Sequence, residues 1–128
     1  MYDPQHHADK LGLKVIEGNP GHGLRGRWIG NQTIILRPGL TWIQHRCTLA
    51  HEIVHAEYDP PLIPHHLSAK AEARADRIAA LRLIDHQDFI DVARIYDSLP
   101  QLAYELGVTP KILTTYLETS HEENHGQS

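Results

Sequence analysis

Cysteine is almost absent from this sequence, and several classes of protein are excluded with it. Cys47 is the only cysteine among 128 residues, so the chain can form no disulfide within itself and no zinc site built from several thiolates. Basic residues are also few, because 12 Lys and Arg stand against 16 Asp and Glu, a formal net charge of −4. This balance disfavours a protein whose main task is to neutralise a phosphate backbone. Any metal ion has to be held by His, Asp or Glu.

Long apolar segments are missing as well. No run of apolar residues approaches the roughly 18 that a membrane-spanning helix requires. The first ten residues are polar and lack the basic and apolar segments of a secretion signal. We therefore expect a cytoplasmic protein that has no membrane partner. Histidine, in contrast, occurs 11 times, which points to metal chemistry or to pH-dependent behaviour.

The first third of the chain has the pattern of a small sheet. Over residues 13–36, short stretches that alternate apolar and polar residues are separated by Gly and Asn. This pattern predicts short strands joined by turns, with Gly30-Asn31 as a hairpin turn. We expect a mostly antiparallel sheet, the β part of an α+β fold.

Helical patterns fill the rest of the chain. From Leu40 onward the apolar residues recur at steps of three and four, which predicts a helix buried on two sides. One apolar flank consists of Ile43, Cys47, Ala50 and Val54, and the other of Leu49, Ile53 and Ala56. A second helix is expected from Ser68, its N-cap, to Ile84, after a stiff proline-rich connector over residues 59–64.

Three shorter helices are expected over residues 88–96, 99–106 and 110–117. The predicted fold is a small antiparallel sheet, two long helices and a helical C-terminal extension. Its core is expected to span residues 1–85, and the extension, residues 86–120, to pack on that core. Residues 121–128 lack an apolar anchor and are expected to form a flexible tail.

The first long helix carries a metal-binding motif. Residues 51–55 read H-E-x-x-H. Residues four apart lie one above the other on a helix, so the rings of His51 and His55 can reach one ion at about 2.0–2.1 Å. Glu52 projects beside that ion and can take a proton from a bound water molecule. The motif predicts metal-assisted hydrolysis.

Two histidines and a water molecule leave a zinc ion one protein ligand short. Glu72 on the second helix is the best candidate, and Asp76 lies on the same face one turn later. Unpaired, two carboxylates at this spacing would cost the helix about 0.2–0.5 kcal/mol. A cation beside Glu72 and a ligand histidine that donates to Asp76 would remove this repulsion. Pro61 stands where the metzincins have a third histidine, which excludes that class.

Two simpler readings compete with the metal site. The histidines can be ordinary core residues of an amphipathic helix, and the carboxylates can belong to a solvated helix face. The register of Glu52, Glu72 and Asp76 with the two histidines counts against the first reading.

This set of residues resembles the zinc peptidases of the ImmA/IrrE family, whose site is similar to that of the thermolysin-like gluzincins. The resemblance covers about residues 10–85. It rests on the H-E-x-x-H motif, on residues 48–50 before it, and on the E-x-x-A-D pattern that begins at Glu72. The implied site holds one Zn²⁺ through His51, His55 and Glu72, with Glu52 as the general base and Asp76 as the partner that orients a ligand histidine.

The resemblance also implies a function. Family members encoded by phages and mobile elements act on a repressor, so the expected activity is zinc-dependent endopeptidase cleavage of a cytoplasmic regulatory protein such as a repressor. The alternative is a zinc-stabilised anti-repressor module that binds the repressor without proteolysis. A site with two histidines and one glutamate suits zinc and also manganese.

Two details of such a site stay open at the level of the sequence. Tyr58, His65 and His66 are candidates for stabilising the oxyanion. In similar sites an extended substrate pairs with an edge strand, and residues 33–36 are expected to provide it.

The C-terminal part has the outline of a helix-turn-helix, with Gly107 in the turn and Pro110 at the start of the second helix. From residue 86 onward, Arg94 and Lys111 stand against seven Asp and Glu, 2 − 7 = −5. This charge disfavours DNA binding. It favours a role in helical packing or partner docking.

Overall fold

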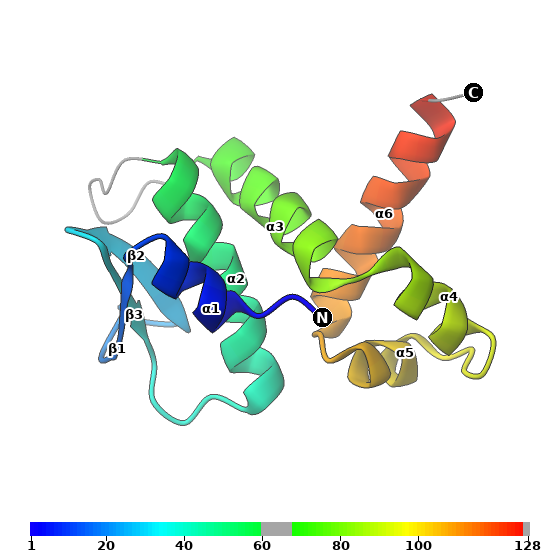
Figure 1. The fold of residues 1–128 in the computed structure, drawn as a ribbon, viewed down its shortest axis with the longest axis horizontal. Helices are drawn as coiled ribbons and strands as arrows, with labels where there is room; N and C mark the ends of the chain where they lie inside the picture. The colour runs from blue at the N-terminus through cyan, green and yellow to red at the C-terminus, as the bar shows by residue number, and fades with distance from the viewer. Residues whose placement is uncertain (60–67, 127–128) are drawn as a thin grey trace.

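The computed structural model describes residues 1–59 and 68–126, and it confirms an α+β fold with a helical C-terminal part. The connector prolines after residue 59 lie outside the described residues. In order along the chain, the elements are α1 (Pro4–Lys10), β1 (Lys14–Glu17), β2 (Gly26–Gly30), β3 (Thr33–Leu36), α2 (Trp42–Tyr58), α3 (Ala69–Leu83), α4 (His86–Ala93), α5 (Leu99–Leu106) and α6 (Pro110–Gly126). Helix α2 lies between the sheet and the other long helices (Figure 1). Within the described ranges, no helix has the length and apolar character to cross a bilayer.

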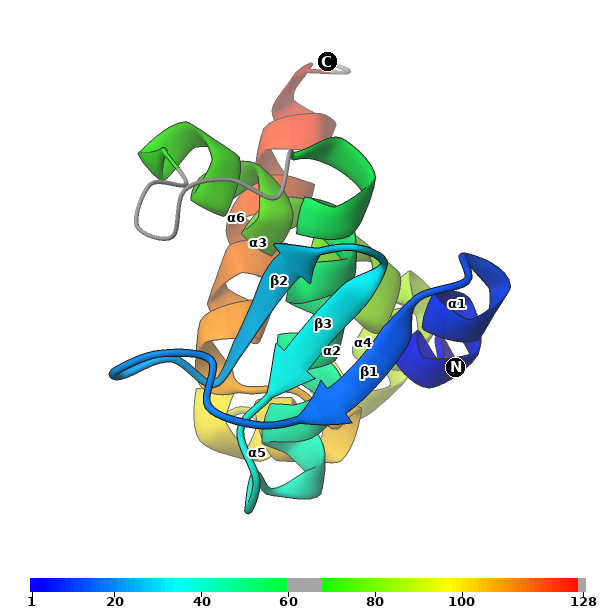
Figure 2. The same cartoon turned by 90° about the vertical axis from the view of Figure 1, so that its left-hand side faces the viewer.

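The three strands form a mixed sheet in the order β1-β3-β2 (Figure 2). Strands β2 and β3 are antiparallel as expected, but β1 pairs with β3 in parallel, so the expectation was wrong for β1. The physical reason is the connection over residues 18–25, which carries the chain across to the far side of β3 before β2 begins. The hairpin turn also lies one residue later than expected, because Gly30 pairs with Thr33 and the two residues between them, Asn31 (50°) and Gln32 (56°), both have positive φ.

Helix α2 is buried on two sides, as its two apolar flanks predict. It begins with a capping box in which the Thr41 side chain accepts from the Gln44 backbone and the Gln44 side chain accepts from Thr41. One hydrophobic cluster, on the helical side, includes Cys47, Ala50 and Val54. The other, on the sheet side, includes Leu49 and Ile53. The polar stripe of α2 is therefore held rigidly between two packed layers.

Helix α3 approaches α2 closely because its contact face is built from alanine. The Ser68 side chain caps it as expected by accepting from the backbone of Ala71. Ala75, Ala79 and Ala80 are fully buried against α2 and α6. These residues share the helical-side cluster with Leu106, Val108 and Leu113 of the C-terminal part. Helices α5 and α6 thus belong to the same hydrophobic core as α2 and α3.

Both ends of the chain contain more helix than the sequence patterns predict. Helix α1 was not expected, although Asp3 caps it and Pro4 occupies its first turn. Helix α6 continues to Gly126, so residues 121–126, expected as part of a flexible tail, extend a helix. The physical reason is that no Pro or Gly interrupts the sequence between Pro110 and Gly126.

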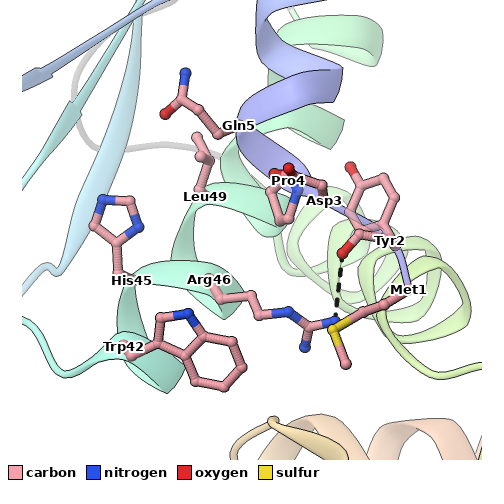
Figure 3. A pocket seen from close by; sticks show the side chains of 9 residues that line it. All are labelled: Met1, Tyr2, Asp3, Pro4, Gln5, Trp42, His45, Arg46 and Leu49. Carbon is pink, nitrogen blue, oxygen red and sulfur yellow. Dashed lines mark hydrogen bonds between the residues drawn. The ribbon is translucent and has the colours of Figure 1, made fainter.

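Arg46 is a buried charge that ties α3, α5 and the N-terminal segment to α2. Only 6% of its surface is exposed. Its Nη1 donates to the carbonyl oxygen of Gly107 at 2.8 Å and its Nη2 to that of Leu83 at 3.4 Å. These carbonyls lie at the C-terminal ends of α5 and α3, where the helix dipoles are negative. Figure 3 shows Arg46 also reaching toward the backbone of Tyr2, in a cavity of about 430 Å³.

Replacing Arg46 by Met should lower the free energy of unfolding by about 2–4 kcal/mol. Met retains the packing volume but leaves buried carbonyl groups without a donor, and each such group costs about 1–3 kcal/mol. Denaturant unfolding measures the change. Arg77→Met on the exposed face of α3 is the matched control and should stay within about 0.5 kcal/mol of the parent chain. Equal effects of both substitutions would contradict the role given to Arg46.

Candidate metal centre

Helix α2 stacks the two histidines of the motif one turn apart. Their ring centroids are 4.7 Å apart, and the Nε2 atoms of His51 and His55 are separated by 3.0 Å. The other nitrogen of each ring faces a carboxylate. His51 Nδ1 lies 2.9 Å from Asp76 Oδ1, and His55 Nδ1 lies 2.8 Å from Asp59 Oδ2. The carboxylates therefore fix both rings with Nε2 directed at a common point.

Helix α3 brings Glu72 to the same point. Its Oε1 lies 2.8 Å from His55 Nε2, and its Oε2 lies 3.3 Å from His51 Nε2. His55 is completely buried, whereas 46% of the Glu72 side chain is exposed. The cluster thus has a dry side formed by α2 and a side open to solvent at Glu72.

The partners of the two rings make this point suitable for a cation. If both Nδ1–H groups donate to their carboxylates, both Nε2 atoms carry lone pairs that face each other at 3.0 Å and also face the Glu72 carboxylate. Three electron-rich atoms at such distances repel unless a proton or a metal ion lies between them. His and carboxylate donors at this spacing are a typical ligand set for zinc.

The charges around the cluster agree with a divalent ion. Four carboxylates, those of Glu52, Asp59, Glu72 and Asp76, face two cations, Arg74 beside Asp59 and Lys111 beside Asp76. With neutral histidines the sum is 2 − 4 = −2. A divalent cation neutralises this charge, so the residues present fit such an ion.

Glu52 lies beside this cluster in a nearly dry position. Its Oε1 accepts from the backbone N–H of Trp28 at 2.9 Å, and its Oε2 lies 3.9 Å from His51 Nε2. One donor atom from each of His51, Glu52 and His55 falls within 4.8 Å of the others. Burial raises the pKa of Glu52 and outweighs the opposing effect of the two histidines. A carboxylate with a raised pKa is suited to accepting and returning a proton near neutral pH.

Without a metal ion the cluster holds a proton instead. Burial alone would lower the pKa of His51, but its hydrogen bonds with Asp76 and Glu72 outweigh burial and raise that pKa from 6.5 to about 10. The same hydrogen bonds from His51 and His55 lower the pKa of Glu72. The metal-free site is therefore arranged to retain positive charge at neutral pH.

The metal-free protein should lose stability as the pH rises from about 6.5 to about 10. In this window His51 keeps its proton in the folded chain but loses it in the unfolded chain, so folding takes up a proton and rising pH opposes it. Below pH 6.5 this contribution is fully present. Zinc displaces the proton, so zinc affinity should rise with pH, about tenfold per unit for each proton displaced. Unfolding curves at several pH values, recorded with chelator and with zinc, test both the pH dependence of stability and the pH dependence of zinc affinity. A metal-free chain that becomes more stable between pH 6.5 and about 10 would contradict the predicted pH dependence of stability.

The structure brings together all five side chains singled out in the sequence, and it adds others that were not foreseen. Asp59 was missed, although it lies four residues after His55, the spacing that relates His51 to His55. Trp28 was missed because its backbone contact with Glu52 spans 24 residues and arises from the packing of β2 on α2. A search for carboxylates one turn after each motif histidine would have found Asp59.

The sequence also suggested a substrate-binding edge strand and candidates for stabilising the oxyanion. Residues 33–36 form β3, the central strand, so they cannot offer a free edge to a substrate, and that expectation was wrong. The reason is that β1 pairs with the edge that the hairpin leaves open. Of the candidates for the oxyanion, His65 and His66 lie outside the described residues. The ring of Tyr58 lies 5.2 Å from the guanidinium of Arg74.

The sequence matches a known protein family. A family model described as the IrrE N-terminal-like domain, of a peptidase family, matches residues 8–117. The match continues beyond residue 85 and includes α4, α5 and the first part of α6, residues 110–117. Neither the search of curated proteins nor the search of solved structures found a match. The match covers most of the chain, which therefore belongs to the peptidase family of the IrrE N-terminal-like domain.

Proposed function

We propose that this chain is a zinc-dependent endopeptidase with a single metal ion. His51, His55 and Glu72 are the proposed ligands, Glu52 is the proposed general base, and Asp76 orients His51. The observation that carries the proposal is the convergence of His51 Nε2, His55 Nε2 and the Glu72 carboxylate within 3.3 Å of one another, with Glu52 beside them.

The donor set favours zinc among the common divalent ions. Calcium and magnesium prefer sites made of oxygen ligands, whereas two imidazoles and one carboxylate leave the open fourth position typical of catalytic zinc. A closed site with four protein ligands would instead favour a purely structural ion.

Glu52 is placed to move the proton during hydrolysis. A bound zinc ion would polarise the scissile carbonyl and lower the pKa of a water molecule to about 7. The backbone N–H of Trp28 holds Oε1 of Glu52, which leaves Oε2 on the side of His51. From there Glu52 can accept a proton from the attacking water and deliver it to the leaving amine. Burial keeps bulk water away from this carboxylate.

Strand β2 is the proposed binding edge for the substrate. In the part of the chain that the structure describes, β2 pairs with β3 on one side and with no strand on the other, where the backbone N–H of Trp28 donates to Glu52. An extended peptide added at this edge would place its backbone next to the base. The irregularity between Trp28 and Gly30 limits the length of regular pairing.

A regulatory protein of the cytoplasm, in particular a phage or mobile-element repressor, is the proposed substrate. The resemblance to the ImmA/IrrE peptidases supports this choice. The test is to incubate the zinc-loaded chain with its cognate repressor and to identify fragments by mass spectrometry, with a chelator as control. Fragments that appear only with zinc support the proposal. Release of the repressor from its operator without fragments would replace it with the anti-repressor alternative.

A further inference from the structure

We propose that Arg74 is a positioning residue for the metal ligand His55, acting through Asp59. The inference rests on the metal site of the proposed function and concerns a side chain outside the ligand set. Arg74 lies on α3 between Glu72 and Asp76, and its Nη2 contacts Asp59 Oδ1 in a short, charged hydrogen bond.

Asp59 is held by contacts on every polar group that it has. Its Oδ2 accepts from His55 Nδ1 at 2.8 Å, and its backbone N–H donates to the carbonyl oxygen of His55 at 2.8 Å. Its own carbonyl oxygen accepts from the indole of Trp28 at 3.2 Å. Its side chain is 10% exposed. The carboxylate is therefore fixed, and it in turn fixes the ring of His55 with Nε2 toward the metal position.

The position of Asp59 in α2 makes a counter-charge necessary. Asp59 is the C-cap of the helix, at the end where the backbone carbonyls give the dipole its negative pole. A negative charge is disfavoured there, so a nearby cation stabilises the Asp59 carboxylate. Arg74 supplies the cation, and its guanidinium is steadied by the ring of Tyr58, 5.2 Å away.

The buried Nε of Arg74 makes an arginine at this position costly for stability. Its Nε is buried, and among the described residues no group accepts a hydrogen bond from it. A residue selected for stability alone would be expected to satisfy this donor. A role in holding Asp59 accounts for an arginine at this position, although residues 1–59 and 68–126 offer its Nε no acceptor.

The second ligand histidine gives an internal comparison. His51 is backed by Asp76, and Asp76 by Lys111, whose Nζ is 3.7 Å away and whose side chain is 77% exposed. Each histidine thus has a carboxylate and a cation behind it, but the cation behind His51 is screened by water. Loss of Arg74 should therefore disturb the metal site more than loss of Lys111.

The test measures zinc affinity by competition with a chromophoric chelator. Arg74→Gln should weaken zinc binding about 10–100-fold, the usual effect of removing an outer partner of a metal ligand, and Arg74→Lys should recover part of the loss. Arg82→Gln is the matched control, because it removes another α3–α2 ion pair, with Glu57, away from the site. It should change the affinity less than about twofold, and Lys111→Met should weaken zinc binding less than Arg74→Gln does.

A double-mutant cycle separates positioning from a general structural effect. In an Asp59→Asn chain, which keeps an acceptor for His55 but removes the charge, Arg74→Gln should weaken zinc binding no further. The visible spectrum of the cobalt-substituted chain should change in Arg74→Gln and stay unchanged in Arg82→Gln. Should Arg74→Gln fail to fold, the zinc affinity of Arg74→Lys is compared in the parent chain and in the Asp59→Asn chain instead.

Two results would overturn the inference, and they are distinguishable. A parent chain that binds zinc while Arg74→Gln binds it equally well would refute the role of Arg74 and leave the metal site intact. A parent chain that binds no divalent ion would refute the proposed function and the role of Arg74 together.

Discussion

Replacing Glu52 by Gln should abolish peptide hydrolysis and leave the metal ion bound. Gln has the shape of Glu, and its side-chain oxygen can still accept from the backbone N–H of Trp28, so the packing of the helix is preserved. It cannot accept a proton. Loss of a general base costs about 10²–10⁴-fold in rate, and the buried position leaves no bulk water to replace it.

The measurement is the rate of repressor cleavage by zinc-loaded parent and Glu52→Gln chains, with zinc content determined on the same samples. Glu57→Gln is the matched control, because this glutamate lies on the same helix but pairs with Arg82 at the surface. Its activity should equal that of the parent. Glu52→Gln with full zinc content and full activity would exclude Glu52 as the base.

Replacing Glu72 by Ala should reduce zinc affinity more than 100-fold. Loss of an outer partner alone costs about 10–100-fold, and Glu72 is proposed to bind the ion directly. The substitution suits a helix, because Ala has the highest helix propensity and the Glu72 side chain is half exposed. Asp76→Ala, which removes only the partner of His51, should have the smaller effect of about 10–100-fold.

Chelator competition measures the zinc affinities of the parent, Asp76→Ala and Glu72→Ala chains, which should fall in that order. Circular dichroism verifies that each chain is folded. Glu118→Ala on the exposed face of α6 is the control and should bind zinc like the parent. A Glu72→Ala chain with unchanged affinity, or one that binds better than Asp76→Ala, would remove Glu72 from the ligand set.

The parts of the fold that the sequence predicts are those that depend on local periodicity. The two apolar flanks of α2 point to two different clusters in the structure, as their spacing requires. Ser68 begins α3 by the rule for N-caps, and the alanines of that helix are buried. The relation between Glu72 and Asp76 is also local, because one helical turn separates them.

The parts that could not be predicted depend on contacts between distant segments. The parallel pairing of β1 follows from where the chain crosses the sheet. The alternation of apolar and polar residues along a strand does not reveal that crossing. The backbone of Trp28 meets Glu52 only because β2 packs on α2, and the sequence near Trp28 carries no sign of it. Arg74 looks like an ordinary surface residue of an Ala/Arg-rich helix until Asp59 is placed beside it.

The proposed metal site is tested most directly by anomalous diffraction at the zinc edge, from crystals of the chain purified with zinc. The expected result is a single zinc ion about 2.0–2.1 Å from Nε2 of both His51 and His55 and about 2.0–2.2 Å from an oxygen of Glu72. A zinc ion bound through other histidines, or a Glu72 carboxylate that remains far from the ion, would contradict the account.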